Sequence, residues 1–198
     1  MRLFLGSAGV SALPEFMDGR RVTYVPTAGK PMADGGGGGE SRAALVDLGF
    51  EITDLDIDGA TQDEIRGALD DADGVFVEGG SPFFLLQAMR ESGFDSVVVE
   101  LVRDGLPYVG MSAGGVVAGP DLEPLSTTSN TSLGPRLEST EGLGLVNLVV
   151  FPHYDAPGRA SEFPDVLLRF GSRFRLLPLT DAQALVVDED GMRIVASE

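Results

Sequence analysis

The sequence has no cysteine and only one histidine, and each of these shortages excludes a kind of chemistry. It also has a single lysine, Lys30. Without cysteine the chain has no disulfide, no thiolate metal ligand and no cysteine nucleophile. The one histidine, His153, is too little for a histidine-rich metal site. A reactive site would therefore have to be built from serine, carboxylates and one imidazole.

Basic residues and long apolar runs are also scarce. Fourteen Lys and Arg residues against 31 Asp and Glu give a formal net charge of −17, and we find no local basic patch. Such a surface repels phosphate backbones. No apolar run approaches the roughly 18 residues of a membrane-spanning helix, and the N-terminal segment lacks the features of a secretory signal. We therefore predict a cytoplasmic protein that binds neither nucleic acid nor membranes.

What is present is the composition of a globular domain, with 43% apolar and 23% charged residues in 198. Short apolar runs alternate with longer segments of helical spacing. The expected strands are Arg2–Leu5, Val22–Pro26, Glu51–Leu55, Val75–Val77, Tyr108–Met111, Leu148–Phe151 and Ala184–Val187. The expected helices are Glu40–Leu48, Gln62–Leu69, Phe83–Arg90, Ser96–Arg103 and Ser161–Phe170. This alternation predicts a three-layer α/β fold with a mostly parallel sheet, in one domain spanning residues 1–198.

Two segments show no such periodicity. The run Gly35–Gly39 predicts a flexible surface loop, and it lacks the Gly-Lys-Ser/Thr ending of a phosphate-binding loop. The polar stretch Leu122–Gly144 predicts loops or short hairpins on the surface. Its position directly after the strongest motif makes it a candidate wall of a substrate cleft.

That motif is Gly110-Met-Ser-Ala-Gly114, which ends an apolar strand and opens a helix of small residues. G-x-S-x-G between a strand and a helix is typical of a nucleophile elbow. The sharp turn strains the central residue, and small neighbours let strand and helix approach. We predict that Ser112 presents its Oγ at the carboxyl edge of the sheet and that the Ala113 N–H points at a developing oxyanion. The alternative is a small-residue turn without chemistry.

A serine nucleophile needs a base, and the only histidine lies where one is expected. His153 follows the apolar run Leu148–Phe151, and the carboxyl ends of parallel strands converge on one cleft. An acidic residue should then hold the imidazole in the productive tautomer. Asp181, in a turn between two apolar runs, leads narrowly. The other candidates are Asp155, Asp121 and Glu123.

A second oxyanion donor would come from a glycine turn at a neighbouring strand end. The segment Val75–Leu86 contains a strand, the pair Gly79-Gly80, and a helix with Ser81 as N-cap and proline in its first turn. We predict that the Gly80 N–H faces the oxyanion. The plainer interpretation is a capped helix start and nothing more.

In their order along the chain, these segments resemble the peptidase E family, which includes aspartyl dipeptidases and cyanophycinases. The resemblance rests on Pro26–Ala28, Gly79–Phe83 with Leu85 and Leu86, Gly110–Gly114, Gly119–Glu123, Pro152–Tyr154 and Leu179–Ala182. It implies a class I glutamine amidotransferase-like, flavodoxin-like fold. It also implies Ser112 as nucleophile, His153 as base and Asp181 as the acid. Gly80 and Ala113 match the family's backbone oxyanion donors.

The chain departs from the family pattern after the double glycine and after the elbow helix. The family usually has Asn-Thr where this chain has Ser81-Pro82. Members often carry an acid in the loop after the elbow helix, but Ser126–Asn130 holds none. This absence either favours Asp181 as the orienting acid or signals weakened activity. Aspartyl dipeptidases also need a cation for the substrate carboxylate, which we expect from Arg159, with Ser81 as a further substrate contact.

The predicted function is hydrolysis of small peptides through a Ser-His-acid triad and an acyl-enzyme. A domain of this size leaves little surface for a long binding groove, and the mechanism implies no metal or organic cofactor. Dipeptidase-like activity with a preference for N-terminal Asp follows only from the resemblance. A second copy of the chain, in a homodimer, is compatible with the sequence but not established by it.

Three alternatives stay open. An amidotransferase-like domain would normally use a cysteine nucleophile, and none is present. A catalytically inactive domain that binds a small molecule could retain the elbow. An esterase of the α/β-hydrolase type would place its acid between serine and histidine and carry an HGGG-type oxyanion motif, which this sequence lacks.

Overall fold

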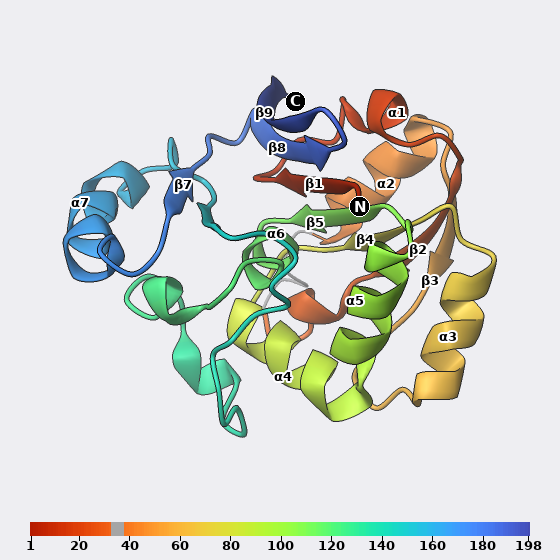
Figure 1. Cartoon of the computed structure of the whole chain (residues 1–198), viewed down its shortest axis with the longest axis horizontal. Coiled ribbons are helices and arrows are strands. Elements are labelled where there is room, and N and C mark those ends of the chain that lie inside the picture. Colours follow the sequence, from red (N-terminus) through yellow and green to blue (C-terminus); the bar gives the residue numbers. More distant parts are fainter. Residues whose placement is uncertain (33–37) are drawn as a thin grey trace.

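A seven-stranded sheet forms the centre of the computed structural model, which describes residues 1–32 and 38–198 (Figure 1). The strand order is β3-β2-β4-β5-β1-β8-β9. Its strands are β1 (Leu3–Gly6), β2 (Arg21–Val25), β3 (Glu51–Asp54), β4 (Gly74–Val77), β5 (Tyr108–Met111), β8 (Gln183–Asp188) and β9 (Gly191–Ala196). The first five strands pair in parallel, whereas β8 runs antiparallel to β1, and β9 antiparallel to β8. The predicted mostly parallel α/β fold is therefore confirmed.

Helices cover both faces of this sheet because its strands bury residues on both sides. In β1, Leu3 and Leu5 belong to one buried cluster, and Phe4, which points the other way, belongs to a second. The helices α1 (Leu13–Phe16) and α2 (Gly38–Asp47) pack on the Phe4 side. The opposite face is covered by α3 (Gln62–Asp70), α4 (Pro82–Ser92), α5 (Phe94–Arg103) and α6 (Ala113–Val117) (Figure 1).

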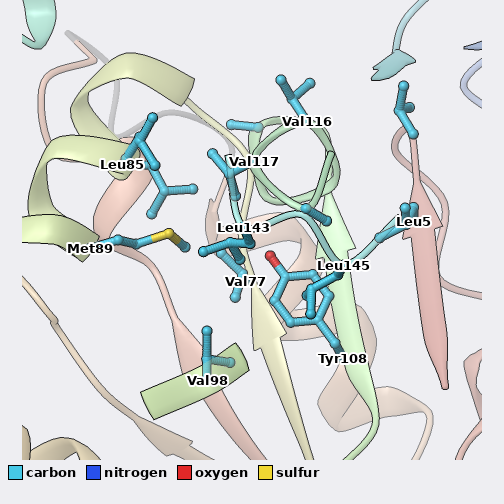
Figure 2. Close-up of a cluster of buried hydrophobic side chains, with 14 of the residues drawn as sticks. Leu5, Val77, Leu85, Met89, Val98, Tyr108, Val116, Val117, Leu143 and Leu145 are labelled. Atoms are coloured by element: carbon cyan, nitrogen blue, oxygen red, sulfur yellow. The ribbon is translucent and has the colours of Figure 1, made fainter. Parts of the chain in front are cut away.

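The short helix α6 is held in place by the larger of the two buried clusters. Figure 2 shows Leu85 and Met89 of α4 on one side of this cluster and Tyr108 of β5 on the other, with Val117 of α6 between them. The buried Tyr108 hydroxyl donates a hydrogen bond of 2.7 Å to the Gly114 carbonyl. Burial also raises the pKa of Tyr108, so the phenol stays protonated and remains a donor. This packing fixes the helix that follows Ser112.

A separate two-stranded sheet carries the histidine. Here β6 (Val149–Phe151) pairs in parallel with β7 (Leu176–Pro178), beside α7 (Arg159–Phe170) (Figure 1). The sequence analysis assumed that the strand before His153 shares a sheet with the strand before Ser112, and this is wrong. Both edges of β1 are already paired, with β5 and with β8, so β6 finds no edge there.

Most predicted elements match the observed ones to within two residues at each end, apart from a few instructive differences. The strand β9 and the short helix α1 were not predicted; β9 is largely exposed, and its apolar run Ile194–Ala196 is short. Gly38 and Gly39 lie in α2, not in a loop, and the rest of the Gly35–Gly39 prediction falls outside the described residues. No helix within the described ranges is long and apolar enough to cross a membrane.

The polar stretch Leu122–Gly144 is irregular, as predicted, but it is not wholly superficial. It contains short 3-10 helices at Glu123–Leu125 and Thr131–Leu133. Its apolar residues Leu122, Leu125 and Leu143 are buried against the main core. The few leucines in this polar stretch therefore anchor it to the domain.

Candidate active site

The site is organised around Ser112, in the turn between β5 and α6. Its backbone has φ 46° and ψ −107°, a strained conformation for a residue with a side chain. The Ser112 N–H donates to the Gly6 carbonyl at 2.9 Å, and its carbonyl accepts from the Val116 N–H at 3.0 Å. These bonds hold the turn between β1 and the first turn of α6, as a nucleophile elbow requires.

The second glycine of the motif is required by a close approach. A Cβ atom on Gly114 would lie 2.1 Å from the Val77 carbonyl oxygen of β4, a distance that no side chain allows. The glycine therefore lets α6 start directly against the end of β4. This brings the Gly79–Gly80 turn, which follows β4, next to Ser112: a Cβ on Gly79 would lie 3.1 Å from the Ser112 Cβ.

His153 meets Ser112 from the end of β6. The Ser112 Oγ and the His153 Nε2 are 2.8 Å apart, a hydrogen-bond distance. His153 has φ 59°, so both partners of this contact have the left-handed backbone conformation that residues with side chains rarely adopt. The Tyr154 N–H donates to the Leu179 carbonyl at 2.9 Å, which ties the histidine turn to the segment that leads to Asp181.

Asp181 completes a line of three side chains. Its Oδ1 lies 2.6 Å from the His153 Nδ1, so the carboxylate can hold a proton on that nitrogen and leave Nε2 free to accept from serine. The rival acids lie elsewhere. Asp155 accepts a hydrogen bond from the Asp181 N–H at 2.8 Å, and Glu123 is paired with Arg173 at 2.6 Å. Asp121 accepts a hydrogen bond of 2.8 Å from the Glu123 N–H.

Ser7 also belongs to this arrangement, and the sequence analysis missed it. Its Oγ donates to the Asp181 Oδ1 at 3.1 Å and accepts from the His153 N–H at 2.7 Å. The side chain is almost fully buried. Ser7 directly follows β1 at the carboxyl edge of the sheet, so the rule that identified His153, a polar residue after an apolar strand, would have found it.

Two backbone N–H groups beside Ser112 lack a protein acceptor. Ala113 is the first residue of α6, and the first N–H groups of a helix have no intrahelical partner. The Gly80 N–H has no acceptor among the residues that the structure describes. These are the two donors that the sequence analysis placed at the oxyanion.

Two cavities border Ser112. The larger, of about 380 Å³, is lined by Ser7, Gly9, Glu40, Ser41, Glu78 and Glu198 among others. The smaller, of about 250 Å³, is lined by residues that include Met32, Leu125, Ser129 and Arg159. Ser112, His153 and Gly80 line both. A substrate held over Ser112 could therefore extend into both cavities, and Leu125 and Ser129, from the stretch after Leu122, line the smaller one.

The geometry is that of a hydrolase, and the comparisons with known proteins agree. The model of peptidase family S51 matches residues 10–195. The chain belongs to peptidase family S51. The uncharacterized peptidase Lmo0363 of Listeria monocytogenes is 28% identical over 191 residues, which cover 93% of both proteins. Peptidase E of Shewanella denitrificans is 30% identical over 186 residues, 90% of this chain and 76% of that protein. Peptidase E of Streptomyces coelicolor is 39% identical over 120 residues, 61% of this chain and 46% of that protein.

Two solved structures extend the comparison to the fold. A crystal structure of a proposed peptidase E from Listeria monocytogenes EGD-e aligns with a TM-score of 0.85 and 26% identity, over 100% of this chain and 98% of that one. A peptidase from an acI-B1 actinobacterium aligns with a TM-score of 0.70 and 24% identity, over 99% and 87% of the two chains. The predicted family, fold and enzyme class, a serine peptidase, are thus confirmed.

The two side chains expected to bind substrate lie in different surroundings in this S51 peptidase. The Ser81 hydroxyl is buried and accepts from the Phe84 N–H at 3.3 Å, which caps α4. Ser81 lines neither of the two cavities. Arg159 lines the smaller cavity; its guanidinium stacks 4.6 Å from the Phe151 ring centroid and pairs with Glu162 at 3.1 Å. Of the two, only Arg159 lines a cavity that borders Ser112.

Metal ligands are not gathered in this region. Within residues 1–32 and 38–198, no group of three or more His, Asp or Glu side chains is arranged to hold a metal ion. The chemistry below is therefore derived from the chain's own serine, imidazole, carboxylate and backbone groups.

Proposed function

We propose that this S51 peptidase is a dipeptidase-like enzyme that uses Ser112, His153 and Asp181 as a catalytic triad. The observation that carries the proposal is the continuous pair of contacts from Ser112 Oγ to His153 Nε2 (2.8 Å) and from His153 Nδ1 to Asp181 Oδ1 (2.6 Å). In this order a serine can lose its proton to an imidazole whose other nitrogen is held by a carboxylate. The strained turn under Ser112 supports the same role.

In the proposed reaction, the Ser112 Oγ attacks the peptide carbonyl carbon while the His153 Nε2 takes the hydroxyl proton. The carbonyl oxygen becomes negative and accepts hydrogen bonds from the N–H groups of Gly80 and Ala113. The imidazolium then gives its proton to the leaving amine, and the acyl group stays on Ser112. Water enters, loses a proton to His153 and attacks the ester carbonyl, which releases the acid and restores the serine.

The charges around the two cavities suggest how a dipeptide is oriented. Two exposed acidic side chains, Glu40 and Glu198, line the larger cavity, and their charge suits the α-ammonium group that every dipeptide carries. Glu78 lines it too, but both of its oxygens are hydrogen-bonded within the protein. Among the described residues that line the smaller cavity, Arg159 is charged and none is acidic. The side-chain carboxylate of an N-terminal Asp is therefore favoured toward Arg159, while the α-ammonium group of the same residue faces the acidic cavity. This is the basis on which we extend the proposal to acidic dipeptides, including those with N-terminal Asp; we do not extend it to Ser81.

The proposal is tested by combining a serine-directed probe with a substrate panel. We expect a fluorophosphonate to label the protein once, on the peptide that contains Ser112, and dipeptides with free termini to be hydrolysed. A folded protein that neither reacts with the probe nor cleaves any dipeptide would instead be an inactive binding domain. Release of ammonia from glutamine without dipeptide cleavage would favour the amidotransferase-like alternative.

The role of Arg159 leads to a prediction about specificity. Arg159→Gln is expected to raise KM for Asp-containing dipeptides by about 10- to 100-fold, the effect of losing a hydrogen bond to a charged group (about 1.5–3 kcal/mol). Neutral dipeptides should keep their KM within a factor of about three, because they lack the side-chain carboxylate. The measurement is kcat and KM for Asp-Leu and Asn-Leu with both proteins.

Arg173→Gln is the matched control, because Arg173 pairs with Glu123 and lines neither cavity. It should leave both substrates unaffected. An equal rise in KM for Asp-Leu and Asn-Leu in Arg159→Gln would show that Arg159 shapes the cavity and does not select charge.

A further inference from the structure

A buried glutamate stands directly before the double glycine, and the proposed mechanism gives it no task. Glu78 follows β4, and only 4% of its surface is exposed. A buried acid is costly unless its oxygens are hydrogen-bonded. Both oxygens of Glu78 accept hydrogen bonds: Oε2 from the Tyr24 hydroxyl at 2.6 Å, and Oε1 from the Gly79 N–H at 2.7 Å. The second of these bonds lies inside the turn that faces Ser112.

Three of the four consecutive backbone N–H groups in this turn donate to acceptors within the protein. The Glu78 N–H donates to Val25, and the Ser81 N–H donates to the Ala28 carbonyl at 2.9 Å. The Gly79 N–H donates to the Glu78 carboxylate. Of the four consecutive N–H groups from Glu78 to Ser81, only that of Gly80 has no acceptor within the described part of the chain. Gly80 is also the residue of this turn that lines both cavities, as Ser112 and His153 do.

The conformation of Gly80 explains why hydrogen bonds from outside the glycine pair are needed to fix the turn. Gly80 has φ 139°, and a Cβ there would lie 2.2 Å from the Ala28 carbonyl oxygen. Two adjacent glycines can rotate the peptide between them at little cost. Rotation would turn the Gly80 N–H away from Ser112. A bond from Glu78 to the Gly79 N–H removes this freedom from one side, and the Ser81–Ala28 bond removes it from the other.

We infer that Glu78 is a positioning residue for the oxyanion site: its carboxylate anchors the Gly79–Gly80 turn so that the Gly80 N–H is presented to the reacting carbonyl. The inference rests on the proposed role of Ser112 as nucleophile. Tyr24, on the neighbouring strand β2, acts through Glu78 by fixing the other carboxylate oxygen. Neither residue forms a bond to the substrate in this scheme.

The chemistry of the two partners explains why an acid occupies this position. Tyr24 stays a phenol, because burial and the neighbouring Glu78 charge both raise its pKa. Burial raises the pKa of Glu78 as well, and hydrogen bonds from Tyr24, Gly79 and Ser41 oppose that rise. All of these partners are donors. A carboxylate offers acceptors on both oxygens, whereas an amide of the same shape would point an N–H₂ group at one of the donors.

The test is Glu78→Gln, with Tyr24→Phe as its matched control. The glutamine keeps the volume but removes the charge and one of the two acceptor oxygens, so the Gly79 N–H loses its charge-assisted hydrogen bond and the turn is held less firmly. We expect kcat to fall by about 10- to 100-fold, part of the 10²- to 10³-fold that removal of one oxyanion donor costs. KM should stay within a factor of about two, because the donor acts on charge that develops only in the transition state. Tyr24→Phe keeps the Gly79 bond and should lower kcat by less than about fivefold.

A second readout separates failure of this inference from failure of the proposed function. The fluorophosphonate places its own oxygen where the oxyanion forms, so the rate of labelling reports on the donors without any peptide substrate. Glu78→Gln should be labelled about 10-fold or more slowly than the parent protein. The inference would be overturned if Glu78→Gln kept both its kcat per labelled site and its labelling rate within twofold of the parent protein. This holds even if the variant unfolds at a lower temperature. Labelling without dipeptide cleavage would overturn the proposed substrate and leave the labelling rates to decide the role of Glu78. No labelling of the parent protein would overturn both.

Discussion

Ser112→Ala is expected to abolish peptide hydrolysis while leaving the protein folded and able to bind dipeptides. Removing the hydroxyl removes the atom that attacks the carbonyl, and loss of a serine nucleophile lowers kcat by about a million-fold in serine peptidases. What is left is the slow reaction that the oxyanion donors and substrate binding sustain alone. The measurement is kcat for a dipeptide of the panel, with a detection limit at least four decades below the parent rate.

The small size of the change makes this experiment specific. Alanine keeps the Cβ, so the strained backbone at φ 46° and the bond from the residue-112 N–H to the Gly6 carbonyl are preserved. Dipeptide binding, measured by calorimetry, should therefore survive, and fluorophosphonate labelling should disappear. Ser129→Ala is the control, because Ser129 lines the smaller cavity without contacting His153. Hydrolysis that persists in Ser112→Ala but not in the control would remove Ser112 from its proposed role.

The candidate site was predictable from the sequence where one residue carries a local signal. Gly110 to Gly114 form a recognisable strand–turn–helix motif, and the chain contains a single histidine, so Ser112 and His153 could be paired before any distance was known. The structure brings these two side chains within hydrogen-bond distance. Asp181 was harder to assign, because 31 acidic residues compete and only the fold decides which of them faces the imidazole.

Other parts of the site depend on contacts that no local pattern encodes. Ser7 lies more than a hundred residues from both of its partners, so its place after β1 marks it as a candidate but only the fold shows which residues it contacts. Glu78 looks like one acid among many until the fold buries it against Tyr24. The fold shows the same limit. The apolar run that became β6 was recognised as a strand, but its separation from the main sheet follows from β8 occupying the edge of β1.

Asp181→Asn is the second change expected to have a large effect, and it tests the order of the three side chains. The Asp181 Oδ1 faces both the His153 Nδ1 and the Ser7 hydroxyl, which are donors when the imidazole carries its proton on Nδ1. An asparagine can turn its N–H₂ group toward Nδ1 and stabilise the other tautomer, in which Nε2 already holds a proton and cannot accept one from Ser112. We expect kcat to fall by about 10⁴-fold, as in other triads whose aspartate is replaced by asparagine.

Asp155→Asn provides a control at the neighbouring acid. Asp155 only accepts the Asp181 N–H, and an asparagine Oδ1 can accept it equally well, so kcat should change by less than about threefold. The Asp181 side chain is 47% exposed, so its contact with His153 should contribute at most about 1 kcal/mol to the free energy of unfolding. The loss in Asp181→Asn should therefore come without a large change in thermal stability. A large loss in Asp155→Asn together with near-normal kcat in Asp181→Asn would exchange the roles of the two acids. The expected pattern would instead leave Asp181 as the acid that sets the histidine tautomer, with Ser7 holding both residues in place from the end of β1.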